Sequence, residues 1–587
     1  MKNNSFTLQE PSAKKRITMS CGERVQVNIN DHADVLVIGS GAAGMMAARA
    51  AADQGANVII VDKSLIGRGG ATVLAQMTVA VALGEAEEDS IESHWEDTVS
   101  GGRGLSDPEI VRSIVERGPE VIADMESYRV KWARTEQGHR SQVVSPGHSK
   151  KRCVYVDILN TGGATSKGLR RVISNDEKIK RLKNVAVTRL VTSQGRVLGA
   201  VGFSVEDMKM VSISASQVIL ATGGLTEVFE RNSASTNMTG DGFLLAAEAG
   251  CELRDMEMVQ FFPIAHLYPP VVGIDPIMWD PFRYKLGGRL LNGAHEEFME
   301  TYTGEVAGKY TATRDLTSYA IFKEVEAGRG SPHGGAYLDF TMIKEEDLRK
   351  GFGPVIDILE SQGIDLTKDM IEVAPMAHFM LGGVKVNNKL ETTVPNLYAC
   401  GELIYGMHGA NRLSGNAMTE ALVTGRIAGE NATQNVGERN DEYVAKETSK
   451  EKRRLESFWY PSSKSADDTS MLTFRKKIQT ILWKGSGPLR AEKELEQALC
   501  NIERLTEEIS QTPLEPQKRY ALPQVEKLEA YTMAKLGAAI VKGALERRES
   551  RGAHVRLDYP DEQEETFSSK FDYKDGCWSY SKVKMKN

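Results

Sequence analysis

A glycine-rich turn between a strand and a helix near the N-terminus constrains the fold more than any other feature. Residues 33–38 form an apolar run typical of a buried strand, and Gly39-Ser40-Gly41-Ala42-Ala43-Gly44 follows directly. A small-residue helix is expected over 45–54, and a second apolar run over 57–61 ends in Asp62. This spacing is that of a βαβ unit that binds a dinucleotide. Its glycines allow the tight turn, the approach of a pyrophosphate and close packing of the helix, and Asp62 binds ribose hydroxyls.

Further strands end in glycine turns. Residues 218–220 lead into Ala221-Thr222-Gly223-Gly224, and residues 397–400 lead into Gly401-Glu402. If these strands share one sheet with the first, the nucleotide domain is discontinuous and an insertion lies between them. A dinucleotide that contacts so many separate loops is FAD rather than a mobile NAD. The candidate cofactor-binding residues from these loops are Gly39, Gly41, Ala43, Gly44, Asp62, Lys63, Gly69, Gly70, Thr222, Gly223 and Asp241.

Composition narrows the class of protein. Hydrophobic residues make up 41% of the 587 residues and charged residues 26%, which excludes a disordered, collagen-like or coiled-coil chain. The net charge of −7 provides no positive electrostatic field that would attract nucleic acid, so a nucleic-acid-binding function is not expected. The six cysteines are scattered without a C-x-x-C, so we expect no metal centre and no disulfide framework. No apolar run approaches the roughly 20 residues that span a bilayer, and no signal peptide is visible. We expect a cytoplasmic protein without membrane insertion.

The C-terminal part has helical character. Leu495, Leu499, Ile502, Leu505 and Ile509 repeat at steps of three and four, as do Met533, Leu536, Ile540 and Ala544. Both patterns predict amphipathic helices. We expect a helical domain from about residue 441, ending in an irregular tail over about 558–587.

Several motifs together carry a resemblance to a known family. They are His408-Gly409-Ala410-Asn411-Arg412-Leu413, Pro375-Met376-Ala377-His378, Thr313-Arg314-Asp315 and Glu549-Ser550-Arg551-Gly552-Ala553-His554. The chain resembles, over about 33–560, the flavoprotein subunits of the fumarate reductase and succinate dehydrogenase family. The resemblance implies an α/β fold: a Rossmann-like FAD-binding domain with an inserted α+β capping domain and a C-terminal helical domain. The expected divisions are an extension over 1–30, the FAD-binding domain over 31–255 and 373–440, the cap over 256–372, and the helical domain with its tail over 441–587.

The resemblance also implies residue roles. Arg314 matches the arginine that transfers a proton to substrate carbon, while flavin N5 transfers hydride. His378 and Arg412 match the pair that holds a substrate carboxylate. A guanidinium fork beside an imidazole is suited to fixing a carboxylate and polarising the adjacent double bond. Glu402 is expected to bind the ribityl chain of FAD, and Asn416 and its neighbours are expected to pass under the flavin ring.

This sequence departs from the family at two places. Where some members attach FAD through a histidine before Thr-x-x-x-Gln, this chain has Ala71 before Thr72 and Gln76, so we expect non-covalent FAD. The family's Gln-Phe-His-Pro-Thr is Gln260-Phe261-Phe262-Pro263-Ile264 here, and the glutamate and arginine of its proton route become Pro281 and Tyr284. One carboxylate clamp survives, while the opposite end, including Phe262 and Tyr284, is apolar and aromatic. Burying a second carboxylate there costs several kcal/mol. His266 is a candidate for partial compensation.

We therefore expect a flavoenzyme acting on a CH–CH or C=C bond of a small acid such as an aryl or alkyl 2-enoate. Alternatives remain open: fumarate or succinate as substrate, an L-aspartate-oxidase-like or adenylylsulfate-reductase-like enzyme, or a non-catalytic FAD subunit. Without cluster ligands in the chain, electrons are expected to pass to a partner, and the resemblance implies an iron–sulfur subunit. Such a complex could hold the chain at the inner face of the membrane.

Overall fold

The glycine fingerprint lies in the middle of a seven-stranded sheet. The computed structural model describes residues 29–156, 160–272, 276–279, 283, 286–303, 314–462, 470–517 and 519–585. Strand β1 (Ile29–Ile38) leads into helix α1 (Ala42–Asp53), and the chain returns in β2 (Val58–Val61), which is parallel to β1. A parallel return requires a crossover helix, so the predicted βαβ unit is confirmed.

The other strands of this sheet come from distant parts of the chain. The order is β6-β2-β1-β9-β8-β7, and a further strand, β16, pairs in parallel with β9. Because β9 and β16 are neighbours in the sheet, the FAD-binding domain is discontinuous, as the glycine turns predicted. The bounds are β6 (Ile179–Leu182), β7 (Val185–Ser193), β8 (Arg196–Ser204), β9 (Met210–Leu220) and β16 (Leu397–Ala399).

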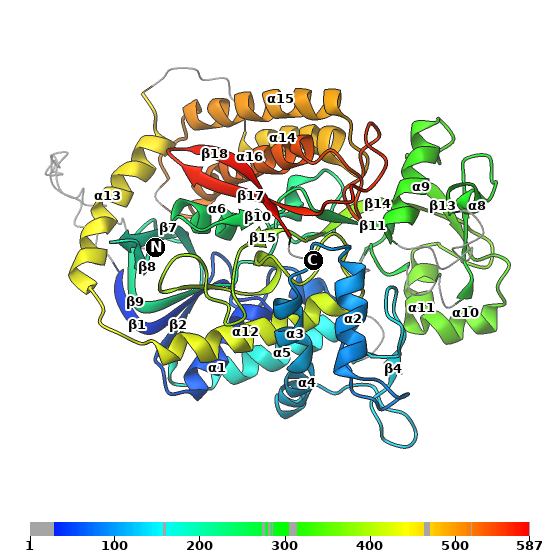
Figure 1. The fold of residues 1–587 in the computed structure, drawn as a ribbon, viewed down its shortest axis with the longest axis horizontal. Helices are drawn as coiled ribbons and strands as arrows, with labels where there is room; N and C mark the ends of the chain where they lie inside the picture. Colours follow the sequence, from blue (N-terminus) through cyan, green and yellow to red (C-terminus); the bar gives the residue numbers. More distant parts are fainter. Residues whose placement is uncertain are drawn as a thin grey trace, which may run out of the picture.

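Small residues let helices pack closely beside this sheet. Helix α12 (Asn416–Gln434) contacts α1 at two glycines: a Cβ on Gly425 or Gly429 would lie 2.3 Å from the carbonyl oxygen of Ala43 or Ala47. Helix α5 (Thr161–Ser174) packs on the same helix α1 (Figure 1). The remaining elements of this domain are η1 (Thr72–Leu74), β3 (Val79–Ala80), α2 (Ile91–Gly101), α3 (Pro108–Glu116), α4 (Gly118–Ser127), β4 (Gln142–Val143), β5 (Cys153–Val154), η2 (Thr226–Val228), α6 (Asp241–Glu248) and η3 (Gly401–Leu403).

The inserted cap is an antiparallel sheet with its own apolar core, at the right of Figure 1. Its strands follow the order β11-β14-β13-β12. The predicted division at 372/373 falls inside β14, which begins in the cap and ends beside the FAD-binding domain. The bounds are β11 (Val259–Tyr268), β12 (Arg289–Leu291), α8 (Met299–Thr303), α9 (Arg314–Glu326), β13 (Ala336–Asp339), α10 (Glu345–Phe352), α11 (Pro354–Ser361) and β14 (Ile371–Met380).

The C-terminal region is helical, as predicted, but its tail is not irregular. The two predicted helices lie within α15 (Glu492–Gln511) and α16 (Leu522–Glu546), and they pack with α14 (Met471–Ser486) at the top of Figure 1, while α13 (Asp441–Trp459) covers β8 and β9. The tail forms a hairpin of β17 (Phe567–Lys574) and β18 (Cys577–Lys584). It joins a sheet in the order β15-β10-β17-β18, with β10 (Leu253–Arg254) and β15 (Gly383–Val384). The tail is ordered by pairing with strands far away in the sequence, which explains why local composition did not indicate it.

Candidate active site

The fingerprint turn is held by backbone contacts that only glycine allows. Gly39 has a φ of 103°, and a Cβ there would lie 2.3 Å from the carbonyl oxygen of Ala221. A Cβ on Gly44 would lie 2.1 Å from the carbonyl oxygen of Gly39, which fits the predicted close packing of helix on strand. Gly44 itself stays behind the turn, whereas Gly39, Gly41 and Ala43 line a long pocket. The N-terminus of α1 therefore opens onto this pocket and suits a pyrophosphate.

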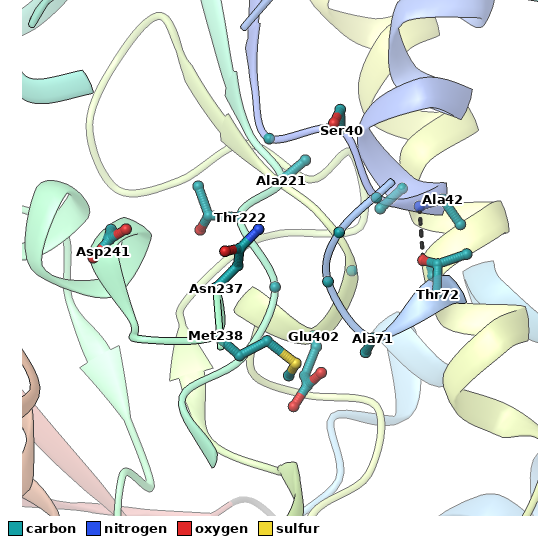
Figure 2. A pocket seen from close by; sticks show the side chains of 18 of the residues that line it. Ser40, Ala42, Ala71, Thr72, Ala221, Thr222, Asn237, Met238, Asp241 and Glu402 are labelled. Carbon is teal, nitrogen blue, oxygen red and sulfur yellow. Dashed lines mark hydrogen bonds between the residues drawn. The ribbon is translucent and has the colours of Figure 1, made fainter. Parts of the chain in front are cut away.

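Two loops converge on that helix start. The backbone N–H of Ala42 donates to Thr72 Oγ1 at 2.9 Å, so η1 is tied to the first turn of α1 (Figure 2). Ala71 and Glu402 lie on one side of the same space and Thr222 and Asp241 on the other (Figure 2). Gly69, Gly70, Ala71, Thr72, Gln76, Thr222, Gly223, Asp241 and Glu402, all predicted cofactor residues, line the pocket together.

The acid at the end of β2 has local partners. Asp62 accepts hydrogen bonds from the N–H and hydroxyl of Ser40 (3.0 and 2.6 Å) and from the N–H and hydroxyl of Ser64 (both 2.8 Å). Lys63 Nζ donates to Thr239 Oγ1 at 2.9 Å and forms ion pairs with Asp241 and Glu529, both at 2.6 Å. These acids raise the pKa of Lys63 despite its burial, so it stays charged.

The helical domain also contributes to the pocket, which the sequence did not indicate. Leu528, Glu529, Tyr531 and Thr532 of α16 line it, as does Val187 of β7. No local motif marks these positions, because they become part of the site only through the packing of α16 on α6.

The polar lining fits FAD. Thr222 Oγ1 and Gln76 Oε1 are buried in the pocket wall without a protein partner. Burial raises the pKa of Glu402 to about 8, and its Oε1 accepts from the N–H of Met380 at 3.0 Å. Buried polar atoms require partners, and the hydroxyls of a ribityl chain and a diphosphate can supply them. Glycine turns, a helix N-terminus and unpaired polar atoms from separate parts of the chain line one pocket, which matches a dinucleotide that contacts several loops.

The predicted catalytic residues line the same pocket. Arg314 at the start of α9, His378 on β14 and Arg412 before α12 all line it. The guanidinium of Arg314 lies over the ring of Phe262, with its Cζ 4.8 Å from the centroid, and Arg412 lies over Phe379 at 4.7 Å. Such stacking leaves guanidinium N–H groups at the edge of the stacked plane to bind an anion.

The electrostatics of this cluster favour an anion. Burial, together with the charge of Arg314, lowers the pKa of Arg412 to about 9. Burial and the charges of Arg412 and Arg314 hold the pKa of His378 well below its ordinary value, so its imidazole is neutral. His378 Nδ1 lies 2.8 Å from Ser233 Oγ, and Arg314 Nη2 lies 3.5 Å from Ser414 Oγ. Ser233 and Ser414 also line the pocket, and nothing in their sequence context marked them.

The cap wall that faces these cations is apolar. Phe262 is 2% exposed, and its ring contacts His378 edge-on with centroids 5.5 Å apart. Ile277 lines the pocket beside it. Tyr284, the other residue predicted to face the substrate, lies outside the described residues, as does Pro281.

The structure places the side chains of His266 and Asn416 away from the pocket. His266 does not compensate for the lost clamp, because it accepts from Trp279 Nε1 at 3.2 Å and its Nε2 bonds the carbonyl oxygen of Pro269. The side chain of Asn416 does not face the pocket: its amide bonds His94 Nε2 at 2.9 Å and Thr98 Oγ1 at 3.0 Å. Its neighbours Gly415 and Ala417 line the pocket instead, because the first turn of α12 directs Asn416 toward α2.

Two further observations concern ions and membranes. Among the described residues, no group of three or more histidine, cysteine or acidic side chains could hold a metal ion. In the same part of the chain, none of the helices has the length and apolar character needed to cross a bilayer.

Comparisons with known proteins agree with this geometry. Residues 34–418 match the FAD binding domain family, and residues 475–586 match the family described as the fumarate reductase flavoprotein C-terminus. One chain of the CoM/CoB fumarate reductase of Methanothermobacter marburgensis is 33% identical over 91% of this chain and 95% of its own length. The L-aspartate oxidase of Streptomyces coelicolor is 31% identical over 91% of this chain and 90% of its own.

A solved structure extends the agreement to the whole fold. A quinol fumarate reductase chain of E. coli superposes with a TM-score of 0.87 at 26% identity, covering 94% of this chain and 97% of that one. The family matches and the relatives together span the FAD-binding domain, the cap and the helical domain. The chain belongs to the fumarate reductase and succinate dehydrogenase flavoprotein family, a family of oxidoreductases, and its cofactor is FAD.

Proposed function

We propose that this flavoenzyme acts on the C=C or CH–CH bond of an acid with one carboxylate and a larger apolar part, such as an aryl or alkyl 2-enoate. The observation that carries the proposal is Phe262, whose ring contacts both Arg314 and His378 where the resemblance places a polar clamp. A second carboxylate against Phe262 and Ile277 would lose its hydration without gaining a partner there, at a cost of several kcal/mol. An apolar substituent at the same place gains burial.

The side chains in the pocket have separate roles in the proposed reaction. Arg412 and the neutral His378 hold the carboxylate, and the withdrawal of electron density toward them polarises the adjacent double bond. When bound, FAD supplies hydride exchange with the substrate carbon. Arg314 delivers the proton to the neighbouring carbon in reduction and removes it in oxidation, so hydride and proton together account for both new C–H bonds. Phe262 holds the Arg314 guanidinium in place through its ring face.

An assay with reduced viologen as electron donor tests the substrate class. We expect faster turnover of cinnamate or acrylate than of fumarate. Fumarate turnover far above the other two would refute the proposal and favour a fumarate reductase or succinate dehydrogenase proper. The 31% identity to an L-aspartate oxidase keeps an oxidase as a second candidate, and formation of peroxide from L-aspartate would favour it.

We infer that FAD is bound without a covalent link. Ala71 lies in the pocket at the position where a linking histidine is expected, and its methyl group has no nucleophilic atom. After acid precipitation the yellow colour should remain in the supernatant. A yellow pellet would contradict the inference.

We also infer that electrons are exchanged with a partner protein that carries an iron–sulfur cluster. The relative from Methanothermobacter marburgensis is named as one subunit of its fumarate reductase, which supports an assembly of several chains. Purification at native expression levels should bring an iron-containing protein with this chain. Full turnover with a physiological donor by the isolated chain alone would refute the partner.

A further inference from the structure

A short segment after η2 is fixed against the strand that carries His378. The N–H of Ala377 donates to the carbonyl oxygen of Arg231 at 2.9 Å, and the N–H of Ser233 donates to the carbonyl oxygen of Ala377 at 3.0 Å. This bridge places the hydroxyl of Ser233 2.8 Å from Nδ1 of His378.

The flanking residues hold this segment in one conformation. Asn232 Nδ2 donates to the carbonyl oxygen of Phe229 at 2.7 Å, and Asn232 Oδ1 accepts from the N–H of Ala234 at 3.0 Å. The guanidinium of Arg231 donates to the carbonyl oxygens of Gly334 (2.9 Å) and His333 (3.2 Å) in the cap. The segment is therefore tied to β14, to itself and to the cap, so the position of the Ser233 hydroxyl is set by the backbone.

The contact decides what His378 can offer to the pocket. A neutral imidazole has one donor and one acceptor nitrogen, and the partner of one nitrogen sets the role of the other. The Ser233 hydroxyl is able to donate to Nδ1 or to accept from it; when it donates, the imidazole proton is on Nε2, the nitrogen that remains for a ligand in the pocket that His378 lines. A carboxylate has no proton to give, so only this tautomer bonds it.

We propose that Ser233 is a positioning residue that donates to Nδ1 of His378 and so stabilises the Nε2–H tautomer, in which His378 donates to a substrate carboxylate. The proposal rests on the proposed function, in which His378 and Arg412 share that carboxylate. Ser233 acts through His378 and need not touch the substrate.

The test measures how tightly carboxylates bind to the FAD-loaded protein, and the change in flavin absorbance on binding is the signal. The probes are cinnamate, acrylate, fumarate and L-aspartate. Ser233→Ala should weaken binding of the best probe about 10-fold or more, because it leaves a buried imidazole nitrogen without its partner. Ser233→Thr keeps the hydroxyl and should stay within about threefold of the wild type. Ser174→Ala, which removes an exposed hydroxyl at the end of α5, is the matched control.

A double-mutant cycle separates positioning from a general structural effect. In the His378→Ala background, Ser233→Ala should add nothing further to the loss of binding, since its effect passes through the imidazole. Ser233→Ala that binds the probe like the wild type would overturn the proposal. An equal loss in the two backgrounds would also overturn it. FAD content and thermal midpoint show whether each variant is folded.

The two proposals can fail separately. If the wild type binds one of the four acids but reduces or oxidises none of them, the proposed function fails and the binding measurement still decides the role of Ser233. If none of the four binds, His378 has no carboxylate to hold and the role of Ser233 is overturned as well.

Discussion

At the residue scale, the site depends on cations that stack on aromatic rings. Replacing Arg314 with lysine removes the planar guanidinium that lies over Phe262. It also moves the N–H group from which the proton is proposed to be transferred to the substrate. We expect Arg314→Lys to lose about 100-fold or more of the viologen-linked activity while FAD stays bound. The FAD-to-protein absorbance ratio is measured beside the rate. Arg504→Lys, at a surface ion pair with Glu508 on α15, is the control, and full activity in Arg314→Lys would contradict its catalytic role.

Phe262 is a second single residue with a predicted effect, because its side chain is proposed to decide between substrates with one carboxylate and substrates with two. Phe262→His places a hydrogen-bond donor in the apolar wall and should raise the rate on fumarate relative to cinnamate about 10-fold. Phe262→Leu keeps the wall apolar and should leave the preference where it is in the wild type. The ratio of kcat/KM for the two acids is the measurement, and an unchanged ratio in Phe262→His would refute the specificity role of this position.

At the scale of elements, α2 and the start of α12 are joined by buried histidines. Burial lowers the pKa of His94 to about 3 and that of His148 to about 4. In the unfolded chain both imidazoles take up protons below about pH 6.5, whereas the folded state resists protonation until the pH reaches the lowered values. Stability is therefore present at neutral pH and falls as the pH drops below about 6.5, by about 1.4 kcal/mol per pH unit for each histidine.

Replacing His94 removes one of these contributions. We expect the thermal midpoint of His94→Gln to fall less between about pH 6.5 and about pH 5 than that of the wild type, whatever its value at neutral pH. His139→Gln, at an exposed position, is the control and should follow the wild-type curve. Parallel curves for His94→Gln and the wild type would show that His94 is protonated in the folded state as easily as in the unfolded chain.

At the scale of the whole molecule, the helical domain contributes part of the wall of the cofactor pocket. Glu529 of α16 accepts from Lys63 at the end of β2 and from Arg475 of α14 at 3.1 Å, so one carboxylate joins the two domains. Glu529→Gln breaks the ion pair that holds α16 against Lys63, so the wall that α16 contributes to the pocket is held less firmly, and the Kd of FAD should rise about 10-fold. Equilibrium dialysis of FAD against the variant measures it. Glu496→Gln on the exposed face of α15 is the control, and an unchanged Kd in Glu529→Gln would mean that the domain contact does not hold the cofactor.

Residues close together in the sequence were enough to predict the βαβ fingerprint, the discontinuous FAD-binding domain and the cluster of Arg314, His378 and Arg412. The glycine turn could be predicted because its geometry depends on a few adjacent residues, and the candidate catalytic residues because they stand in short motifs shared with the family. Four other features emerge only in the folded molecule: the contact of Ser233 with the imidazole of His378, the lining of the pocket by α16, the turn of Asn416 away from it and the strands of the tail. Each depends on contacts between residues far apart in the sequence, whose energy arises only when packing brings the elements together.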